Sequence, residues 1–130
     1  MAMAQETEAL TLPRDTVSAG VRHTMEKPGY GFYIVAEKDG CVIGMLMVTS
    51  EWSDWRNAHF WWIQSVYVLP EFRRQGVYRG LYESVKVRAA DAGNVCGFRL
   101  YVEKSNSVAQ KTYESLGMSE THYAMYEEPI

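Results

Sequence analysis

Cysteine and histidine are scarce in this 130-residue sequence, which contains two cysteines and three histidines. Cys41 and Cys96 are single and far apart, so we expect no disulfide framework and a reducing compartment, the cytoplasm. His23, His59 and His122 are scattered, form no pair at ligand spacing and have no cysteine ligand beside them. The sequence therefore predicts no metal site.

Long apolar runs and an excess of basic residues are also missing. The stretch FWWIQSVYVL is short and is interrupted by Gln64 and Ser65, so no membrane span is expected. The start, MAMAQETEAL, has no basic region followed by an apolar core, and we expect no signal peptide. A net charge of −3 argues against nucleic-acid binding, including binding of RNA on an aromatic platform. An anionic partner would have to be met by a local basic patch.

What is present is typical of one globular domain. Hydrophobic residues make up 47% of the chain and charged residues 22%, and this length suffices for a core without disulfides or metal. No internal repeat, low-complexity segment or long linker interrupts it. We expect residues 1–130 to form a single domain.

The order of apolar patterns and turn residues predicts an α+β fold with a mixed sheet. The strand at 59–69 is apolar on both faces and is expected to be central, with Phe60, Trp62, Gln64, Val66 and Val68 on one face and Trp61, Ile63, Ser65 and Tyr67 on the other. The other expected elements are a helix end at 3–10, a helix within 12–26 capped by Asp15 with Val17, Val21 and Met25 on one face, a hairpin at 31–50 turning at Asp39-Gly40, a loop at 50–58, a helix at 77–92, a strand at 97–103, a helix after Asn106 that ends at Gly117, and a strand at 121–127.

The stretch VYVLPEFRRQGVYRGLY, residues 66–82, has the features of a phosphate-binding turn. A strand that turns directly into a helix leaves backbone N–H groups unpaired at the helix start, where the helix dipole also favours an anion. Gly76 lacks the Cβ atom that would keep a phosphate from the main chain. Arg73, Arg74 and Arg79 can add charge-assisted hydrogen bonds. The alternative, a solvated basic turn in which the glycine serves only backbone geometry, stays open.

Two familiar phosphate-binding motifs are absent from this stretch. No Lys-Ser/Thr follows a second glycine, so it is not a nucleotide-triphosphate P-loop. Nor does it contain the Gly-x-Gly-x-x-Gly pattern of a dinucleotide site.

Instead, two stretches resemble signatures of the GNAT (GCN5-related N-acetyltransferase) superfamily. VYVLPEFRRQGVYRGLY resembles its acetyl-CoA-binding motif, Arg/Gln-x-x-Gly-x-Gly/Ala, through Arg73, Gly76 and Tyr78. EKSNSVAQKTYESLGM resembles its second signature, through Asn106, Ala109, Tyr113, Gly117 and Met118. The sequence departs from the pattern at Tyr78, where a glycine or alanine is usual, and in lacking the family's first strand.

The resemblance implies a three-layer α/β/α fold whose mixed sheet is mostly antiparallel and lacks the usual first strand. It also implies acetyl-CoA as the cosubstrate, with its diphosphate on the backbone of the turn and its pantetheine arm beside the central strand, like an added strand. The residues expected to bind it are Val66, Tyr67, Val68, Arg73, Arg74, Gln75, Gly76, Val77, Tyr78, Arg79 and Asn106. An N–H group near Val68 would stabilise the oxyanion.

Tyr113 is the candidate general acid implied by this resemblance. Its phenol has a reference pKa of about 10, close enough to the ~8.5 of a thiol for proton donation to a departing thiolate. The alternative is a tyrosine on the buried face of a helix with no chemical role.

The acceptor amine must lose a proton before it attacks, and the candidates for the base are Glu51 and Asp54, with Gln64 acting through a water as a further possibility. Trp52, Asp54 and Trp55 of the loop could hold a cationic amine by charge and cation–π contact. Alternatively, these rings pack against the sheet or against a second subunit.

Together these features predict an acetyl-CoA-dependent N-acetyltransferase that acts on a primary amine of a small molecule or peptide by direct attack in a ternary complex. The alternative is a regulatory module that binds coenzyme A or acetyl-CoA without turnover. Because two-fold homodimers are the commonest oligomers and the sheet edge is incomplete, we also expect a homodimer.

Overall fold

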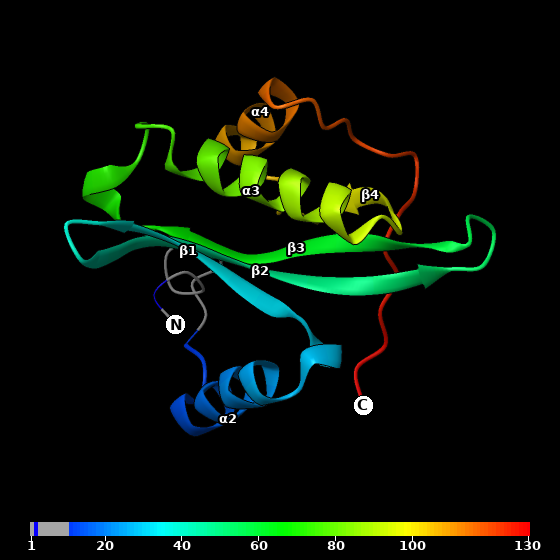
Figure 1. Cartoon of the computed structure of the whole chain (residues 1–130), viewed down its shortest axis with the longest axis horizontal. Helices are drawn as coiled ribbons and strands as arrows, with labels where there is room; N and C mark the ends of the chain where they lie inside the picture. The colour runs from blue at the N-terminus through cyan, green and yellow to red at the C-terminus, as the bar shows by residue number, and fades with distance from the viewer. Residues whose placement is uncertain (1, 3–10) are drawn as a thin grey trace.

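The computed structural model describes residue 2 and residues 11–130 (Figure 1). In chain order the elements are α2 (Arg14–Glu26), η1 (Pro28–Tyr30), β1 (Phe32–Lys38), β2 (Cys41–Ser53), β3 (Ala58–Val68), η2 (Pro70–Phe72), α3 (Val77–Ala92), β4 (Val95–Arg99) and α4 (Ser107–Ser115). The helix end predicted at 3–10 lies outside the described residues. Within the described part of the chain, no strand precedes α2.

The four strands form one sheet in the order β1-β2-β3-β4. β1, β2 and β3 pair in antiparallel fashion, whereas β4 runs parallel to β3. Helices α3 and α4 lie on one face of the sheet and α2 on the other (Figure 1). The predicted three-layer architecture with a mixed, mostly antiparallel sheet is confirmed, and β3 is internal as expected.

The core lies between α3 and the sheet. Its buried members are Ile34, Leu46, Val48, Ile63, Leu81, Tyr82 and Val85. Leu46, Val48 and Val85 are the most completely buried, and each such side chain contributes about 1.5–3 kcal/mol when it is removed from water. The helical spacing of Leu81, Val85 and Ala89 places all three on the buried face of α3, as predicted.

The first hairpin turns at Asp39-Gly40, where both residues have positive φ, 52° and 78°. This is the backbone that a two-residue turn needs to match the twist of its strands. The prediction of a loop over 50–58 is wrong at its ends, because β2 extends to Ser53 and β3 begins at Ala58 to form a second hairpin. Trp52 pairs with His59, and their rings lie 5.0 Å apart, so the ladder continues into a stretch that looked like a loop.

Because β3 contains a β-bulge, the predicted assignment of its residues to the two faces of the sheet is wrong beyond Gln64. The register shifts so that Ser65 and Val66 oppose Leu46, and Ser65 has a φ of 52°. Strict alternation therefore fails at this point, since a bulge inserts one extra residue into a strand. Tyr67 lies on the face of Gln64, and Val66 packs against the core beneath α3.

The side chains of helix α2 are less buried than its apolar pattern predicts. None of its residues is buried, and Val21 and Met25 are exposed. The predicted cap at Asp15 is wrong: the helix begins at Arg14, and its N-cap residue is Pro13, two residues before Asp15, with no side-chain cap. A proline with a φ of −63° suits a helix start, which moves Asp15 into the first turn.

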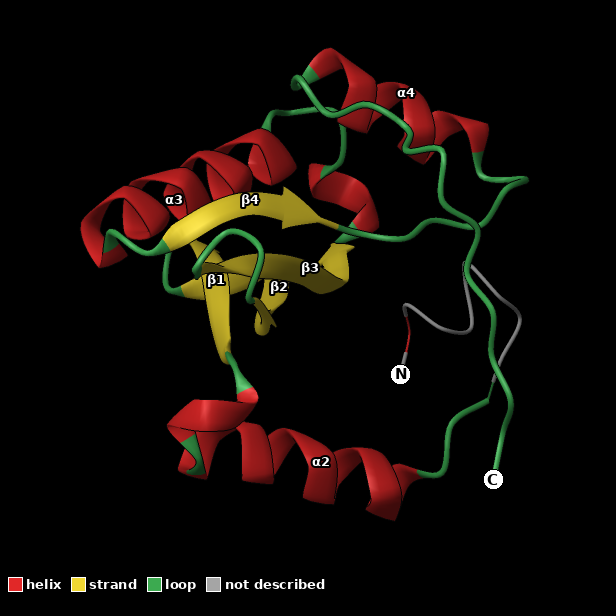
Figure 2. Cartoon of the chain, turned by 90° about the vertical axis from the view of Figure 1, so that its right-hand side faces the viewer, coloured by secondary structure: helices red, strands yellow, loops and turns green. Residues whose placement is uncertain are grey.

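The C-terminal part of the sheet also differs from the prediction. β4 occupies Val95–Arg99 rather than 97–103, and no strand forms at 121–127. Tyr123 and Tyr126 of that stretch are 71% and 95% exposed, so burial does not offset the entropy lost on ordering it as a strand. The segment runs past the sheet toward the level of α2 (Figure 2).

None of the helices in the described part of the chain is long and apolar enough to span a bilayer.

Candidate active site

The turn before α3 has the geometry of an anion-binding site. Gly76 is the N-cap residue with a φ of 81°, and the space where a Cβ atom would stand is open. The first hydrogen bond of the helix joins Gly80 N–H to the carbonyl of Gly76, over 3.0 Å. The amides at 77–79 thus have no acceptor within the helix, and the helix dipole adds positive potential there.

The basic side chains of this turn have different surroundings. Arg73 donates from Nε to the carbonyl of Val68, over 2.8 Å, and its guanidinium lies 5.4 Å from the centre of the Tyr67 ring. Arg74 and Arg79 are exposed. Arg73, which is also exposed, fixes the end of β3 through its Nε, and Arg74 and Arg79 are placed to meet an anion from solvent.

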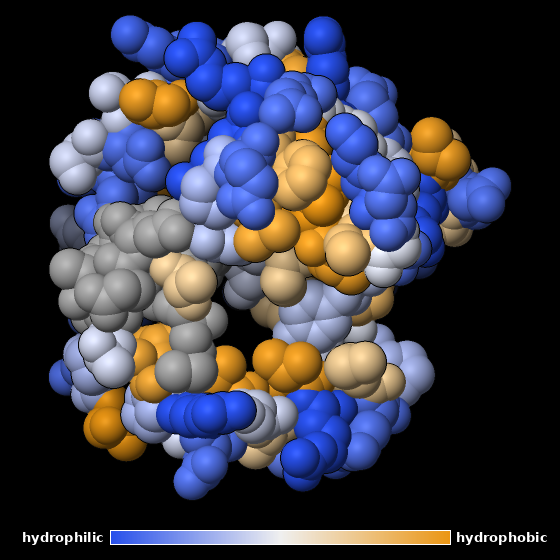
Figure 3. All heavy atoms as spheres, turned by 90° about the vertical axis from the view of Figure 1, so that its left-hand side faces the viewer, coloured by the Kyte–Doolittle hydropathy of each residue, from blue (hydrophilic) through white to orange (hydrophobic). Residues whose placement is uncertain are grey.

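A cavity of about 630 Å³ opens beside this turn, between the start of α3 and α4. Its walls include Val68 from β3, Gly76 and Tyr78 from the turn and α3, and Thr112 and Leu116 from α4. Figure 3 shows the side of the molecule at which η2 and the start of α3 lie. There, hydrophilic residues frame apolar ones in the upper part of the molecule, and a hollow separates this part from α2 below.

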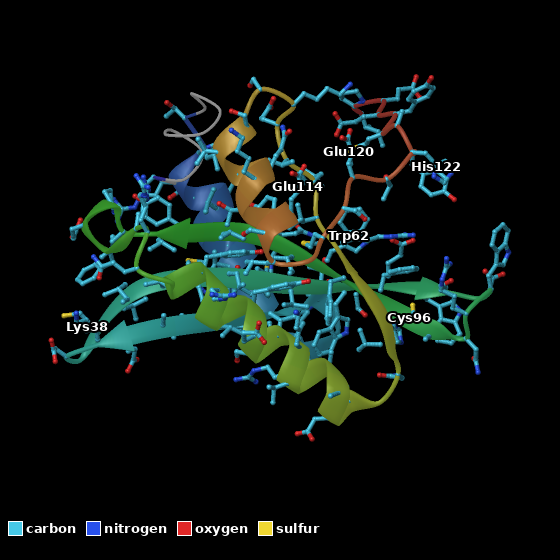
Figure 4. All side chains as sticks on the ribbon, turned by 90° about the horizontal axis from the view of Figure 1, so that it is seen from above. Lys38, Trp62, Cys96, Glu114, Glu120 and His122 are labelled. Atoms are coloured by element: carbon cyan, nitrogen blue, oxygen red, sulfur yellow. The ribbon has the colours of Figure 1, made fainter. Side chains whose placement is uncertain are left out.

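A second, smaller cavity lies where β3 and β4 separate. Their pairing ends at Trp62 and Arg99, and the chain that follows β4 leaves the sheet. Figure 4 shows the chain passing from Cys96 toward Trp62 and then away from the sheet. The cavity, of about 200 Å³, is lined by Ile63, Gln64, Ser65 and Val66 on one side and by Leu100, Tyr101, Val102, Glu103, Asn106 and Tyr113 on the other.

The end of β3 connects the two cavities, because Val66 lines the smaller one and Val68 the larger one. Leu69 N–H bonds to Ile43 of β2 over 2.9 Å. Since neighbouring residues of a strand point their amides to opposite edges, Val68 N–H faces the edge from which β4 has departed. An extended ligand could pair with this edge between the two cavities.

Tyr113 lies at the junction of the two cavities. Its ring is 5.6 Å from that of Tyr78, in an edge-to-face arrangement, and Tyr78 lines the larger cavity. Burial raises the pKa of the Tyr113 phenol above its ordinary value, so the group stays protonated at neutral pH.

Asn106 is the cap of α4, as predicted: its Oδ1 accepts the Ala109 N–H over 3.2 Å. Asn106 also lines the smaller cavity, with Tyr113. The cap uses the carbonyl oxygen of the amide, and the Nδ2 group takes no part in it.

Two of the base candidates, Glu51 and Gln64, lie on the face of the sheet opposite α3. Glu51 Oε1 accepts from Trp62 Nε1 over 2.7 Å and forms an ion pair with Arg99 over 3.4 Å. Gln64 Nε2 donates to Thr49 Oγ1 over 2.7 Å. Gln64 lines the smaller cavity, and Glu51 stands outside it, held by its two partners.

The structure does not bring the predicted acceptor residues Trp52, Asp54 and Trp55 to either cavity. They lie at or near the tip of the second hairpin, where Trp55 is 90% exposed and Asp54 accepts the Trp55 N–H over 3.0 Å. Trp52 lies on the face of His59, whereas its neighbour Glu51 points to the other face.

Comparisons with known proteins agree with this geometry. The model of the acetyltransferase (GNAT) family matches residues 3–118. The chain belongs to the GNAT acetyltransferase family. No curated protein matches its sequence significantly.

Solved structures resemble this GNAT acetyltransferase over most of its length. A possible acetyltransferase from Clostridium difficile 630 is 43% identical with a TM-score of 0.92, and the match covers 99% of this chain and 85% of that one. AAC(6')-Iy in complex with a bisubstrate analogue is 20% identical with a TM-score of 0.77, covering 91% and 81%. Aminoglycoside 6'-N-acetyltransferase AAC(6')-IG from Acinetobacter haemolyticus is 21% identical with a TM-score of 0.77, covering 93% and 84%. The last two show likeness of fold alone.

GNAT enzymes use acetyl-CoA, and the residues present here fit that group. The open space at Gly76, the amides at 77–79 and the exposed Arg74 and Arg79 suit a diphosphate. Among the described residues, no three His, Cys, Asp or Glu side chains are grouped as metal ligands.

Three polar residues that line the smaller cavity, Ser65, Tyr101 and Glu103, were not among the predicted site residues. Tyr101 and Glu103 come shortly after β4, the strand that pairs with β3. This position could have indicated from the sequence that they lie at the gap between the two strands. The bulge that turns Ser65 toward the cavity breaks the alternation, so no pattern indicated it.

Proposed function

We propose that this GNAT protein is an acetyl-CoA-dependent N-acetyltransferase that acts on a primary amine of a small molecule or peptide within a ternary complex. One observation supports this most strongly. The end of β3 lies between the turn at Gly76, which suits an anion, and the gap between β3 and β4, which Tyr113 lines.

In this proposal the chain holds acetyl-CoA by its backbone. The amides of residues 74–78 bind the diphosphate, with Arg74 and Arg79 beside it. The edge of β3 at Val66, Tyr67 and Val68 pairs with the pantetheine arm. Bound acetyl-CoA supplies the acetyl thioester that the amine attacks.

Two groups of the chain act at the reacting atoms. The N–H of Val68, which faces the open edge, stabilises the negative charge on the carbonyl oxygen, an interaction worth about 3–4 kcal/mol in acyl transfer. The phenol of Tyr113, which is protonated at neutral pH, donates its proton to the departing sulfur.

The acceptor amine approaches from the face of the sheet opposite α3, where Gln64 lines the gap between β3 and β4. We assign Gln64 the role of positioning the amine or the water that takes its proton. Glu103, in the wall of the same cavity, is the carboxylate available for proton removal, whereas Glu51 is paired with Arg99 outside that cavity. Trp52, Asp54 and Trp55 have no comparable support as acceptor contacts, because they line neither cavity.

A turnover screen tests the proposal. The purified protein is incubated with acetyl-CoA and polyamines, amino acids, peptide N-termini or aminoglycosides, and release of free thiol is measured. Aminoglycosides belong in the panel because several structural neighbours are named as aminoglycoside acetyltransferases. We expect at least one amine to raise thiol release above the rate without acceptor. Absence of coenzyme A binding in calorimetry would contradict the proposal.

A second candidate is a coenzyme A-binding module without turnover. It is favoured by one observation: Glu51, the carboxylate predicted as a base, is occupied by Trp62 and Arg99. Tight binding of acetyl-CoA with no thiol release on any amine of the panel would support this alternative.

A further inference from the structure

Tyr78 carries an unusual hydroxyl group. Among the described residues, its Oη is the one buried side-chain polar atom without a hydrogen-bond partner. The ring is fixed on two sides, stacked on Tyr82 with centroids 6.1 Å apart and edge-on to Tyr113 at 5.6 Å. A buried donor without an acceptor is unfavourable, because the hydroxyl has lost its hydrogen bonds to water and gained none.

The position of this hydroxyl relates it to the coenzyme site. Tyr78 follows Gly76 by two residues and lines the larger cavity. Its ring also touches Tyr113, which lines the smaller cavity. Tyr78 thus stands between the turn that suits a diphosphate and the residue proposed to protonate the sulfur, where the family pattern has a glycine or alanine.

The surroundings of the hydroxyl indicate a neutral partner. Burial, followed by the nearby phenols of Tyr113 and Tyr82, raises the pKa of Tyr78, so the group is a proton donor at neutral pH. Val77, Val108 and Leu116 of α3 and α4 form the apolar part of the cavity wall, and Arg73, Arg74 and Arg79 form its basic part, at the turn and the start of α3. Between the diphosphate and the thioester of acetyl-CoA lies the pantetheine arm, whose neutral hydrogen-bond acceptors are amide carbonyls.

We infer that the Tyr78 hydroxyl donates a hydrogen bond to an amide carbonyl of the pantetheine arm and so positions the arm on its way to Tyr113. This inference rests on the proposed binding of acetyl-CoA. Tyr78 is a positioning residue here, and the bond satisfies a donor that has no partner in the free protein.

Tyr78→Phe tests the inference, because it keeps the ring and removes only the hydroxyl. Tyr82→Phe is the matched control: it removes a phenol hydroxyl from the stacked neighbour, which lines neither cavity. Calorimetry measures the dissociation constant for coenzyme A and for its adenosine diphosphate fragment, which lacks the arm. Thermal denaturation of each protein is recorded without ligand.

We expect Tyr78→Phe to weaken coenzyme A binding about 3- to 10-fold, the usual value of one neutral hydrogen bond, and to leave binding of the fragment unchanged. Without ligand, the variant should melt at a higher temperature than the wild type, because an unpaired buried hydroxyl is gone. Tyr82→Phe should leave both affinities unchanged.

The outcomes separate this inference from the proposed function. Wild-type protein that binds no coenzyme A contradicts the proposed function. If the wild type binds and Tyr78→Phe binds equally well, the inference is wrong. It is also wrong if coenzyme A and the fragment lose affinity equally, since the hydroxyl then acts on the diphosphate. A lower melting temperature of Tyr78→Phe would show a partner in the free protein and overturn it.

Discussion

At the scale of single residues, Tyr113 gives the sharpest test of chemistry. Tyr113→Phe keeps the ring against Tyr78 and removes the proposed acid. We expect coenzyme A to bind with unchanged affinity while thiol release slows about 10²-fold or more, the usual range for loss of a general acid. Steady-state kinetics on any acceptor found in the screen measures this. Unchanged turnover would leave Tyr113 as a packing residue only.

Burial of three phenols predicts how stability depends on pH. The pKa values of Tyr78, Tyr82 and Tyr113 are all raised, in each case chiefly because burial disfavours the phenolate. Above a pH of about 10 the unfolded chain loses these protons while the folded chain keeps them, so the free energy of unfolding falls as pH rises. Below that value these groups contribute no pH dependence.

Urea unfolding followed between about pH 8 and pH 11 checks this. The midpoint should decline in the alkaline part of that range, and less steeply in Tyr78→Phe, which lacks the most strongly shifted group. A decline of the same slope in the variant would contradict the assignment to Tyr78.

Single residues also show what sequence can indicate and what it cannot. The cap at Asn106 and the open approach to the main chain at Gly76 were predicted, because each follows from the residue's own chemistry. Arg73 was predicted to contact phosphate, and it does line the larger cavity, but the bond from its Nε to the carbonyl of Val68 was not foreseen. That partner depends on how the chain turns back on the strand, which local pattern does not encode.

At the scale of elements, the two ends of α3 provide a matched pair of glycines. Gly76 at the N-cap has a φ of 81° and Gly93 at the C-cap a φ of 77°, and both have open space at the Cβ position. Alanine at either position should cost about 1–2 kcal/mol of stability, because L-residues disfavour this backbone. Only Gly76→Ala should also weaken coenzyme A binding, since its new methyl group stands at the anion site.

Chemical denaturation and calorimetry on both variants measure these effects. Equal losses of stability with a loss of affinity confined to Gly76→Ala would support a direct role of the turn. If Gly93→Ala lost the same affinity, the effect would come from helix strain and not from the ligand site.

Elements with strong local signals were predicted, and those set by partners were not. The spacing of Leu81 and Val85 and the glycine at each end defined α3. In contrast, the alternation at 121–127 resembles that of a strand, but this stretch has no ladder partner within the described chain. A strand is completed by its neighbour, so its own pattern is insufficient.

At the scale of the whole molecule, the sheet has an open side that bears on the predicted homodimer. β4 is a terminal strand of the sheet order, and an edge strand with unpaired backbone groups is a template for association. The C-terminal segment exposes the large apolar side chains of Tyr123, Met125 and Tyr126. Both features favour contact with a second copy, since a two-fold axis would cover them on both chains at once.

Light scattering coupled to gel filtration measures the predicted dimer, and Tyr126→Asp tests the region. Its ring is 95% exposed in the single chain, so a charge there should alter the stability of one chain by no more than about 0.5 kcal/mol. The same charge placed in a contact between copies would be desolvated, and the mass should shift to that of the monomer. Val87→Asp, at an exposed position of α3, is the control and should remain dimeric. A wild-type mass of one chain at all concentrations would contradict the prediction of a homodimer.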